Sequence, residues 1–67
     1  MSRKSKAVLT FIEEYWDKYG FSPTYREIAA AMGGASTSNV KYHLGKLADE
    51  GYLKLHFNVP RGIVVIR

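Results

Sequence analysis

The sequence predicts a small α+β fold that is mainly α, with three helices followed by a C-terminal two-stranded β-hairpin. Two periodicities support this prediction. Apolar residues recur at helical spacing as far as Gly51, and the pattern then changes to the alternation of a strand. With 67 residues and no cysteine, the chain has room for one hydrophobic core and has no disulfide to support it. We therefore expect residues 1–67 to form a single domain.

The first helix is predicted over residues 6–19. One face of this helix carries the apolar residues that should be buried: Val8, Phe11, Ile12, Tyr15 and Tyr19. Gly20 follows in the usual place for a left-handed C-terminal cap. An extended connector should come next, because the residue before Pro23 is disfavoured in the helical conformation.

Two further helices are separated by a short turn that contains glycine. The segment from Thr24 to Glu27 has the form of a capping box, so the second helix should start at Thr24 and end before Gly33. The third helix is predicted over residues 37–50, with Ser36 or Ser38 as its N-cap. Its buried stripe consists of Val40, Leu44 and Leu47. A tight turn between two helices predicts a helix-turn-helix.

The C-terminal residues alternate as in a hairpin. Leu53, Leu55 and Phe57 should share one side of a strand, and the β-branched run 63–66 should return beside it. The connection 56–62 is the predicted tip, which Pro60 should stiffen. Three helices and a hairpin in this order define a winged helix-turn-helix, and the hairpin is its wing.

The charge of the chain favours a polyanionic partner. Ten Lys and Arg residues against six Asp and Glu give a formal net charge of +4. The acids Glu13, Glu14 and Asp17 cluster on the first helix, whereas many of the cations lie in other segments: Arg3, Lys4, Lys41, Lys46, Lys54 and Arg61. No apolar run approaches the roughly 20 residues of a membrane span. We expect a cytoplasmic protein, associated with a bacterial nucleoid, that has no membrane partner.

The third helix carries unusual residues opposite or beside its buried stripe. In DNA-binding members of this fold, the helix after the turn enters the major groove and its N-terminal half meets base edges. Asn39 can pair with adenine, Lys41 with the acceptors of guanine, and Ser38 with either. Tyr42 can contact a phosphate or a thymine methyl group. These four side chains are therefore predicted to read bases.

Other polar residues are candidates for the DNA backbone. Thr24 and Arg26, at the start of the second helix, could hold a phosphate there. Lys46 is a further backbone candidate, and Arg61 is the charge that the predicted tip carries. An arginine in a wing commonly meets a phosphate or enters the minor groove. An ordinary loop with one solvated arginine is the alternative for Arg61.

No enzyme, metal site or cofactor is expected. His43 has no second ligand at metal spacing along its helix, and it should be a packed, hydrogen-bonded side chain. Ser36, Ser38, His43 and Asp49 share one helix that scatters them, and the chain is too small to enclose a catalytic site or a small-molecule substrate.

Three motifs together resemble the N-terminal DNA-binding domain of LexA, the bacterial SOS repressor. They are G-x-x-P-T-x-x-E-I-A (20–29), S-x-S-x-V-x-x-H-L-x-x-L (36–47) and R-G-I (61–63), and the similarity extends from about Ala7 to Ile66. The resemblance implies base reading by Ser36, Ser38, Asn39, Lys41 and Tyr42, with Arg61 in the wing. LexA proteins also carry a self-cleaving, dimerising domain with a Ser and Lys pair. No residues here supply it, so autoproteolysis is not implied.

The sequence thus predicts a sequence-specific regulator of transcription, acting as a repressor, whose partner is double-stranded DNA. We expect a weak or DNA-assisted homodimer, formed through strand 63–66 or the first helix. The alternative is a winged-helix module that binds proteins and not DNA. Its support would be exposed apolar residues: Trp16, Phe57, Val59 and either Val64 or Ile66.

Overall fold

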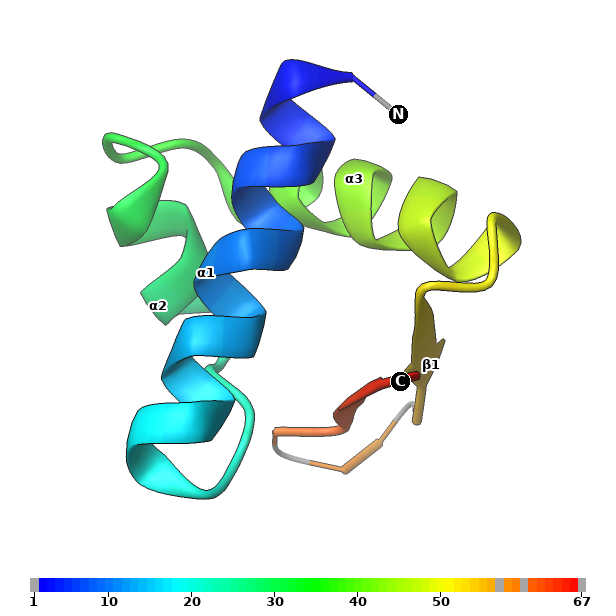
Figure 1. The fold of residues 1–67 in the computed structure, drawn as a ribbon. Helices are drawn as coiled ribbons and strands as arrows, with labels where there is room; N and C mark the ends of the chain where they lie inside the picture. Colours follow the sequence, from blue (N-terminus) through cyan, green and yellow to red (C-terminus); the bar gives the residue numbers. More distant parts are fainter. Residues whose placement is uncertain (1, 57, 60, 67) are drawn as a thin grey trace.

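The computed structural model describes residues 2–56, 58–59 and 61–66. It contains helices α1 (Arg3–Tyr19), α2 (Tyr25–Ala31) and α3 (Thr37–Asp49), followed by strands β1 (Leu53–Leu55) and β2 (Ile63–Val65). In Figure 1, α2 lies to the left of α1 and α3 to its right, and the hairpin lies below α3. This arrangement confirms the predicted winged helix-turn-helix.

A single hydrophobic core joins the three helices to the hairpin. Each helix and each strand contributes to the nine buried apolar residues found among those described: Val8, Ile12, Ile28, Ala29, Val40, Leu44, Leu47, Leu53 and Ile63. The stripe predicted for α3 is therefore buried throughout. Because α1 and α2 both pack against it, α3 is held in a fixed orientation, with its other side directed outward.

Two details of α1 differ from the prediction. The helix begins at Arg3, three residues earlier than expected, because the Ser2 hydroxyl caps it by accepting the Ser5 amide at 3.1 Å. Tyr19 was expected in the core, and that prediction is wrong, since 49% of its surface is exposed. Its ring packs instead on Tyr15, with centroids 4.4 Å apart, and on Phe21. The end of α1 is the predicted one, with Gly20 at φ +80°.

The starts of α2 and α3 are set by side-chain caps. Thr24 and Glu27 form the predicted capping box, with Thr24 as the N-cap and Tyr25 as the first helical residue. Of the two candidates for α3, Ser36 is the cap, and its hydroxyl accepts the Asn39 amide at 3.2 Å. The helix ends at Asp49, one residue before the predicted end, because Glu50 is its C-cap.

A buried hydrogen bond connects α1 to the middle of α3. The Ser5 hydroxyl lies 3.0 Å from Nδ1 of His43, and both residues are buried. Ser2 donates in turn to the Ser5 hydroxyl at 3.0 Å. His43 is thus the packed, hydrogen-bonded histidine that the sequence predicts.

The hairpin is antiparallel, with Leu53 opposite Val65 and Leu55 opposite Ile63. Its second strand ends at Val65, one residue before the predicted end. At the base of the tip, the His56 amide donates to the Gly62 carbonyl at 2.7 Å. A Cβ on Gly62 would lie 2.3 Å from the His56 carbonyl oxygen, so only glycine fits there. The predicted roles of Phe57 and Pro60 concern residues outside those described.

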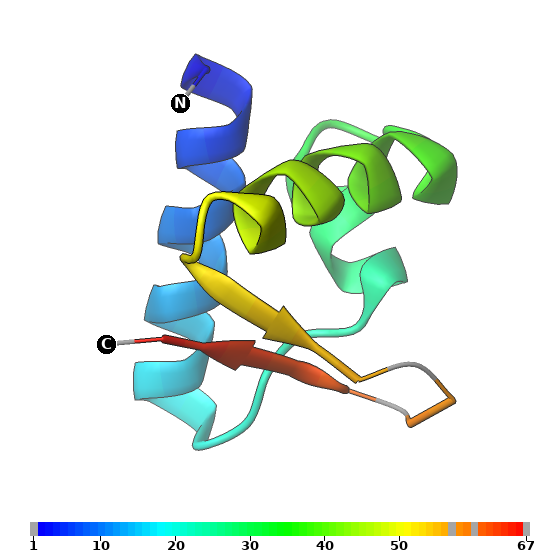
Figure 2. The same ribbon diagram turned by 90° about the vertical axis from the view of Figure 1, so that its right-hand side faces the viewer.

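The hairpin lies beneath α3 and close to the connector between α1 and α2 (Figure 2). It therefore reaches one segment that is far from it in sequence, since Ser22 and Arg61 are 39 positions apart. Within the described ranges, no helix combines the length and apolarity needed to cross a membrane.

Candidate nucleic-acid interface

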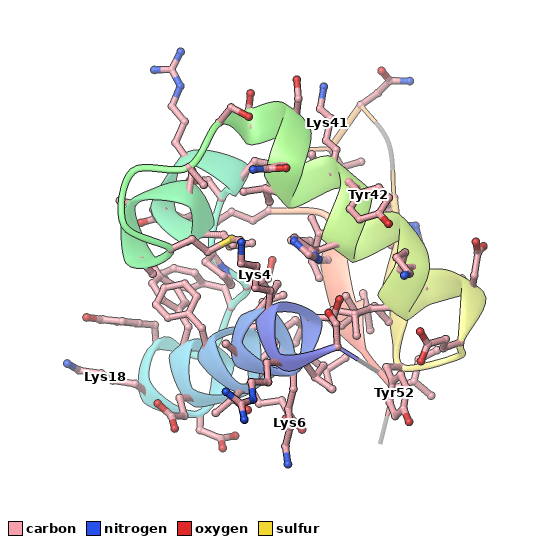
Figure 3. All side chains as sticks on the ribbon, turned by 90° about the horizontal axis from the view of Figure 1, so that it is seen from above. Lys4, Lys6, Lys18, Lys41, Tyr42 and Tyr52 are labelled. Atoms are coloured by element: carbon pink, nitrogen blue, oxygen red, sulfur yellow. The ribbon has the colours of Figure 1, made fainter. Side chains whose placement is uncertain are left out.

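The exposed side of α3 carries the predicted base-reading residues. All five of them are exposed: Ser36, Ser38, Asn39, Lys41 and Tyr42. Figure 3 shows Lys41 projecting from α3 away from α1, whereas Lys6 projects from α1 in the opposite direction. The burial of Val40, Leu44 and Leu47 explains this orientation, because it fixes the rotation of the helix about its axis. All five residues are therefore accessible to solvent.

Tyr42 and Lys46 form a pair one turn apart on α3. The Lys46 ammonium lies 5.5 Å from the centroid of the Tyr42 ring, a spacing at which a cation is attracted to an aromatic face. Tyr42 is 60% exposed, and its ring also meets His43 edge-on. The Tyr42 ring thus contacts both the buried His43 and the Lys46 ammonium.

A groove of about 340 Å³ separates α3 from the hairpin tip. It is lined by Thr24 and Tyr25 at the start of α2, by Lys41 from α3, and by residues near the tip that include Asn58 and Arg61. Arg26 is exposed on the first turn of α2 and does not line the groove. Hydroxyl, amide and cationic groups of this kind suit an anionic backbone.

Arg61 is not the freely solvated side chain that the alternative for the wing assumed. Its Nη1 atom donates to the Glu27 carboxylate at 2.8 Å, to the Ser22 carbonyl at 2.9 Å and to the Tyr15 hydroxyl at 3.3 Å. Its own carbonyl accepts the Ser22 hydroxyl at 2.6 Å. The guanidinium also lies over the Phe21 ring, 4.7 Å from the centroid. Arg61 therefore connects the hairpin tip to α1, α2 and the segment between them.

Sequence reasoning missed the partners of this arginine. It singled out Glu27 for the capping box alone, and it placed Tyr15 in the core. In the structure, Tyr15 donates its hydroxyl proton to the second Glu27 oxygen at 2.9 Å. The capping box was the one signal that marked Glu27, and it gave no indication of a contact with a residue 34 positions away.

The same contacts keep the Glu27 carboxylate ionised. Its pKa falls from an ordinary 4.5 to about 2, mainly because the Thr24 backbone amide donates to it and next because the Tyr15 hydroxyl does. Arg61 adds to this effect, while partial desolvation opposes it. The carboxylate therefore stays negative throughout the physiological pH range.

We expect acid to remove the stabilising contribution of Glu27. A carboxyl whose pKa is lowered by folding stabilises the folded state above its ordinary value of 4.5, and this contribution is lost as pH falls to about 2. In urea titrations across this range, the difference in unfolding free energy between wild type and Glu27→Gln should be largest above pH 4.5 and should shrink toward pH 2. A difference in unfolding free energy that stays constant down to pH 2 would show that folding does not lower the pKa of Glu27.

The three-helix order, the hairpin and the polar face of α3 define a DNA-binding domain of the winged helix-turn-helix class. A family model, the LexA DNA binding domain, matches residues 1–62. The chain therefore belongs to the LexA DNA-binding domain family, which confirms the resemblance drawn from its motifs.

Curated relatives named LexA repressor support this membership. The chain is 42% identical over 64 residues to that of Limosilactobacillus fermentum, covering 96% of this chain and 31% of the relative. It is 36% identical over 67 residues to that of Koribacter versatilis, covering 100% of this chain and 32% of the relative. It is 35% identical over 66 residues to that of Carboxydothermus hydrogenoformans, covering 98% of this chain and 32% of the relative. The chain thus spans about a third of the length of these relatives, within which it corresponds to the DNA-binding part.

Proposed function

We propose that this domain is the operator-reading part of a transcriptional repressor, binding double-stranded DNA with α3 in the major groove. The observation that carries this proposal is the exposed polar half of α3, held outward by a fully buried opposite stripe. A helix of 13 residues presented in this way can reach base edges near its N-terminus. Membership of the family gives DNA as the partner.

The proposed roles follow the position of each side chain. Asn39 and Lys41 make the specifying hydrogen bonds to bases, since amide and ammonium groups match the edges of adenine and guanine. Ser36, Ser38 and Tyr42 complete the base-reading set.

Contacts to the sugar-phosphate backbone fall on both sides of this set. Thr24 and Arg26 are placed at the start of α2, and Lys46 lies further along α3. The hairpin tip with Arg61 forms the far wall of the groove, through which we place one DNA strand.

We propose that this part of the protein acts by binding and not by catalysis. The Ser36 hydroxyl caps α3, and His43 is hydrogen-bonded to Ser5. Neither residue is therefore arranged as a nucleophile or as its general base. The place of action that we propose is the bacterial cytoplasm, on the nucleoid.

Pairing on DNA is the proposed mode of assembly. A small domain with few phosphate contacts gains specificity when two copies occupy a two-fold site. The exposed Ile66, next to β2, lies on one surface that could serve such pairing, and α1 offers the other. Sedimentation of the domain with and without duplex measures this, and a strict monomer bound one per duplex would rule it out.

The second candidate function is a protein-interaction module. Val59 and Ile66 are more than half exposed, which favours it, whereas Trp16 and Val64 are partly buried. Salt separates the two functions. Binding to phosphates weakens steeply with ionic strength, and an apolar interface does not.

Selection from a random duplex library at moderate salt, followed by sequencing of the retained DNA, tests the proposed function. An enriched inverted repeat would support both specific recognition and pairing, and an enriched half-site would support recognition by a monomer. Retention without enrichment would contradict sequence specificity. If no DNA is retained, the protein-interaction function becomes the better one.

A further inference from the structure

The contacts of Arg61 join the hairpin tip to three segments that are distant from it in the sequence. The residue itself belongs to the hairpin tip, and its Nη1 partners come from α1 (Tyr15), from the connector (Ser22) and from α2 (Glu27). These separations range from 34 to 46 residues. A side chain that served only to neutralise a phosphate would have no need of these partners.

The backbone of the tip is held at the same place. Arg61 has φ +57°, a left-handed conformation that is uncommon outside glycine. Its carbonyl accepts the hydroxyl of Ser22, which is only 1% exposed. Arg61 therefore accepts a hydrogen bond from the α1–α2 connector at its main-chain carbonyl, and its guanidinium donates another to the same connector. Such paired contacts can maintain a backbone conformation that is intrinsically unfavourable.

The contact with the Phe21 ring depends on a guanidinium in particular. One end of the guanidinium donates to three oxygens, while its plane lies over the Phe21 ring at 4.7 Å from the centroid. A lysine ammonium carries the same charge and has three donors, but it has no delocalised plane to lie over the ring. Arg61→Lys is therefore a change that preserves charge and removes the geometry.

We propose that Arg61 is a positioning residue, which fixes the hairpin tip against the α1–α2 connector and thereby sets the width of the groove between the wing and Lys41. The groove is lined by Arg61 itself together with Thr24, Lys41 and Asn58. A shift of the tip therefore changes the wall of the groove that faces α3. The effect on DNA rests on the proposed function. The effect on the tip of the free protein does not.

The order of the tip in the free protein is the first test. In ¹⁵N-labelled protein, the heteronuclear NOE of the Asn58 and Val59 amides should fall in Arg61→Lys and in Glu27→Gln. Glutamine at position 27 retains a carbonyl for the capping box, so this variant guards against loss of the fold. Arg26→Gln, which removes an exposed arginine from α2, should leave the tip unchanged. Tip amides as ordered as in wild type in both test variants would overturn the proposal.

Binding to a fluorescein-labelled duplex of mixed sequence, measured over a salt series, is the second test. If Arg61 acts through position, Arg61→Lys should weaken binding about threefold to tenfold, a loss equivalent to one ordinary hydrogen bond. The slope of log K against log salt should stay unchanged, because the charge is kept. Wild-type affinity in Arg61→Lys would overturn the proposal. No binding by the wild type would instead overturn the proposed function, and the result on tip order would stand.

Discussion

Replacing Lys41 and Tyr42 with alanine should remove most of the selectivity of the domain for its preferred duplex. Each base contact of this kind discriminates by about 1–3 kcal/mol, so each single change should lower selective affinity by roughly tenfold to a hundredfold. Both side chains are exposed, and the Tyr42 ring also contacts the Lys46 ammonium. Competition binding between the selected duplex and a scrambled duplex measures the loss.

Lys6→Ala is the matched control for this prediction. It removes one exposed lysine, as Lys41→Ala does, but from α1 and in the opposite direction (Figure 3). Both variants lower the net charge by one, so a general electrostatic effect should appear in both. If Lys41→Ala and Lys6→Ala lose the same affinity for the two duplexes, α3 does not read the bases.

Replacing Leu44 with alanine should leave the domain largely unfolded at room temperature. Leu44 is completely buried at the centre of the α3 stripe, and truncation of such a residue costs about 2–5 kcal/mol. A single core in a chain below about 70–80 residues rarely supplies more than about 3–5 kcal/mol of net stability. The lost free energy is therefore comparable to the total stability of the domain. Urea titration monitored by circular dichroism should show no folded baseline or a greatly reduced midpoint.

The control for Leu44→Ala is Ile66→Ala. Ile66 is 53% exposed, and truncation of a surface residue usually changes stability by no more than about 0.5 kcal/mol. Equal midpoints for Leu44→Ala and wild type would show that the core is not organised around α3.

Local signals predicted most of the fold. The capping box at Thr24, the left-handed Gly20 and the alternation after Gly51 each depend on residues within a few positions, and each appears in the structure as expected. Tyr19 was misplaced because helical spacing defines a face and not its length. The last turn of α1 continues the apolar face beyond the point where other elements cover it, and the ring stays half exposed.

The parts that could not be predicted depend on contacts between distant residues. Arg61 and Glu27 are 34 positions apart, and Ser5 and His43 are 38 positions apart. No periodicity joins such pairs, since they meet only when the hairpin folds back and when α1 crosses α3. The candidate base readers were accessible to sequence reasoning because they lie opposite an apolar stripe on one helix. The partners that hold the wing and the helix in place were not.

The hydrogen bond between Ser5 and His43 has a consequence for transplanting this domain's specificity. It anchors the middle of α3 to a helix outside the helix-turn-helix unit, next to the ring of Tyr42. A graft of residues 36–50 onto another scaffold would carry the candidate base-reading side chains and the buried stripe, but not Ser5, whose hydrogen bond to His43 adds to the contacts that orient α3. We therefore expect a chimaera to need α3 together with the start of α1.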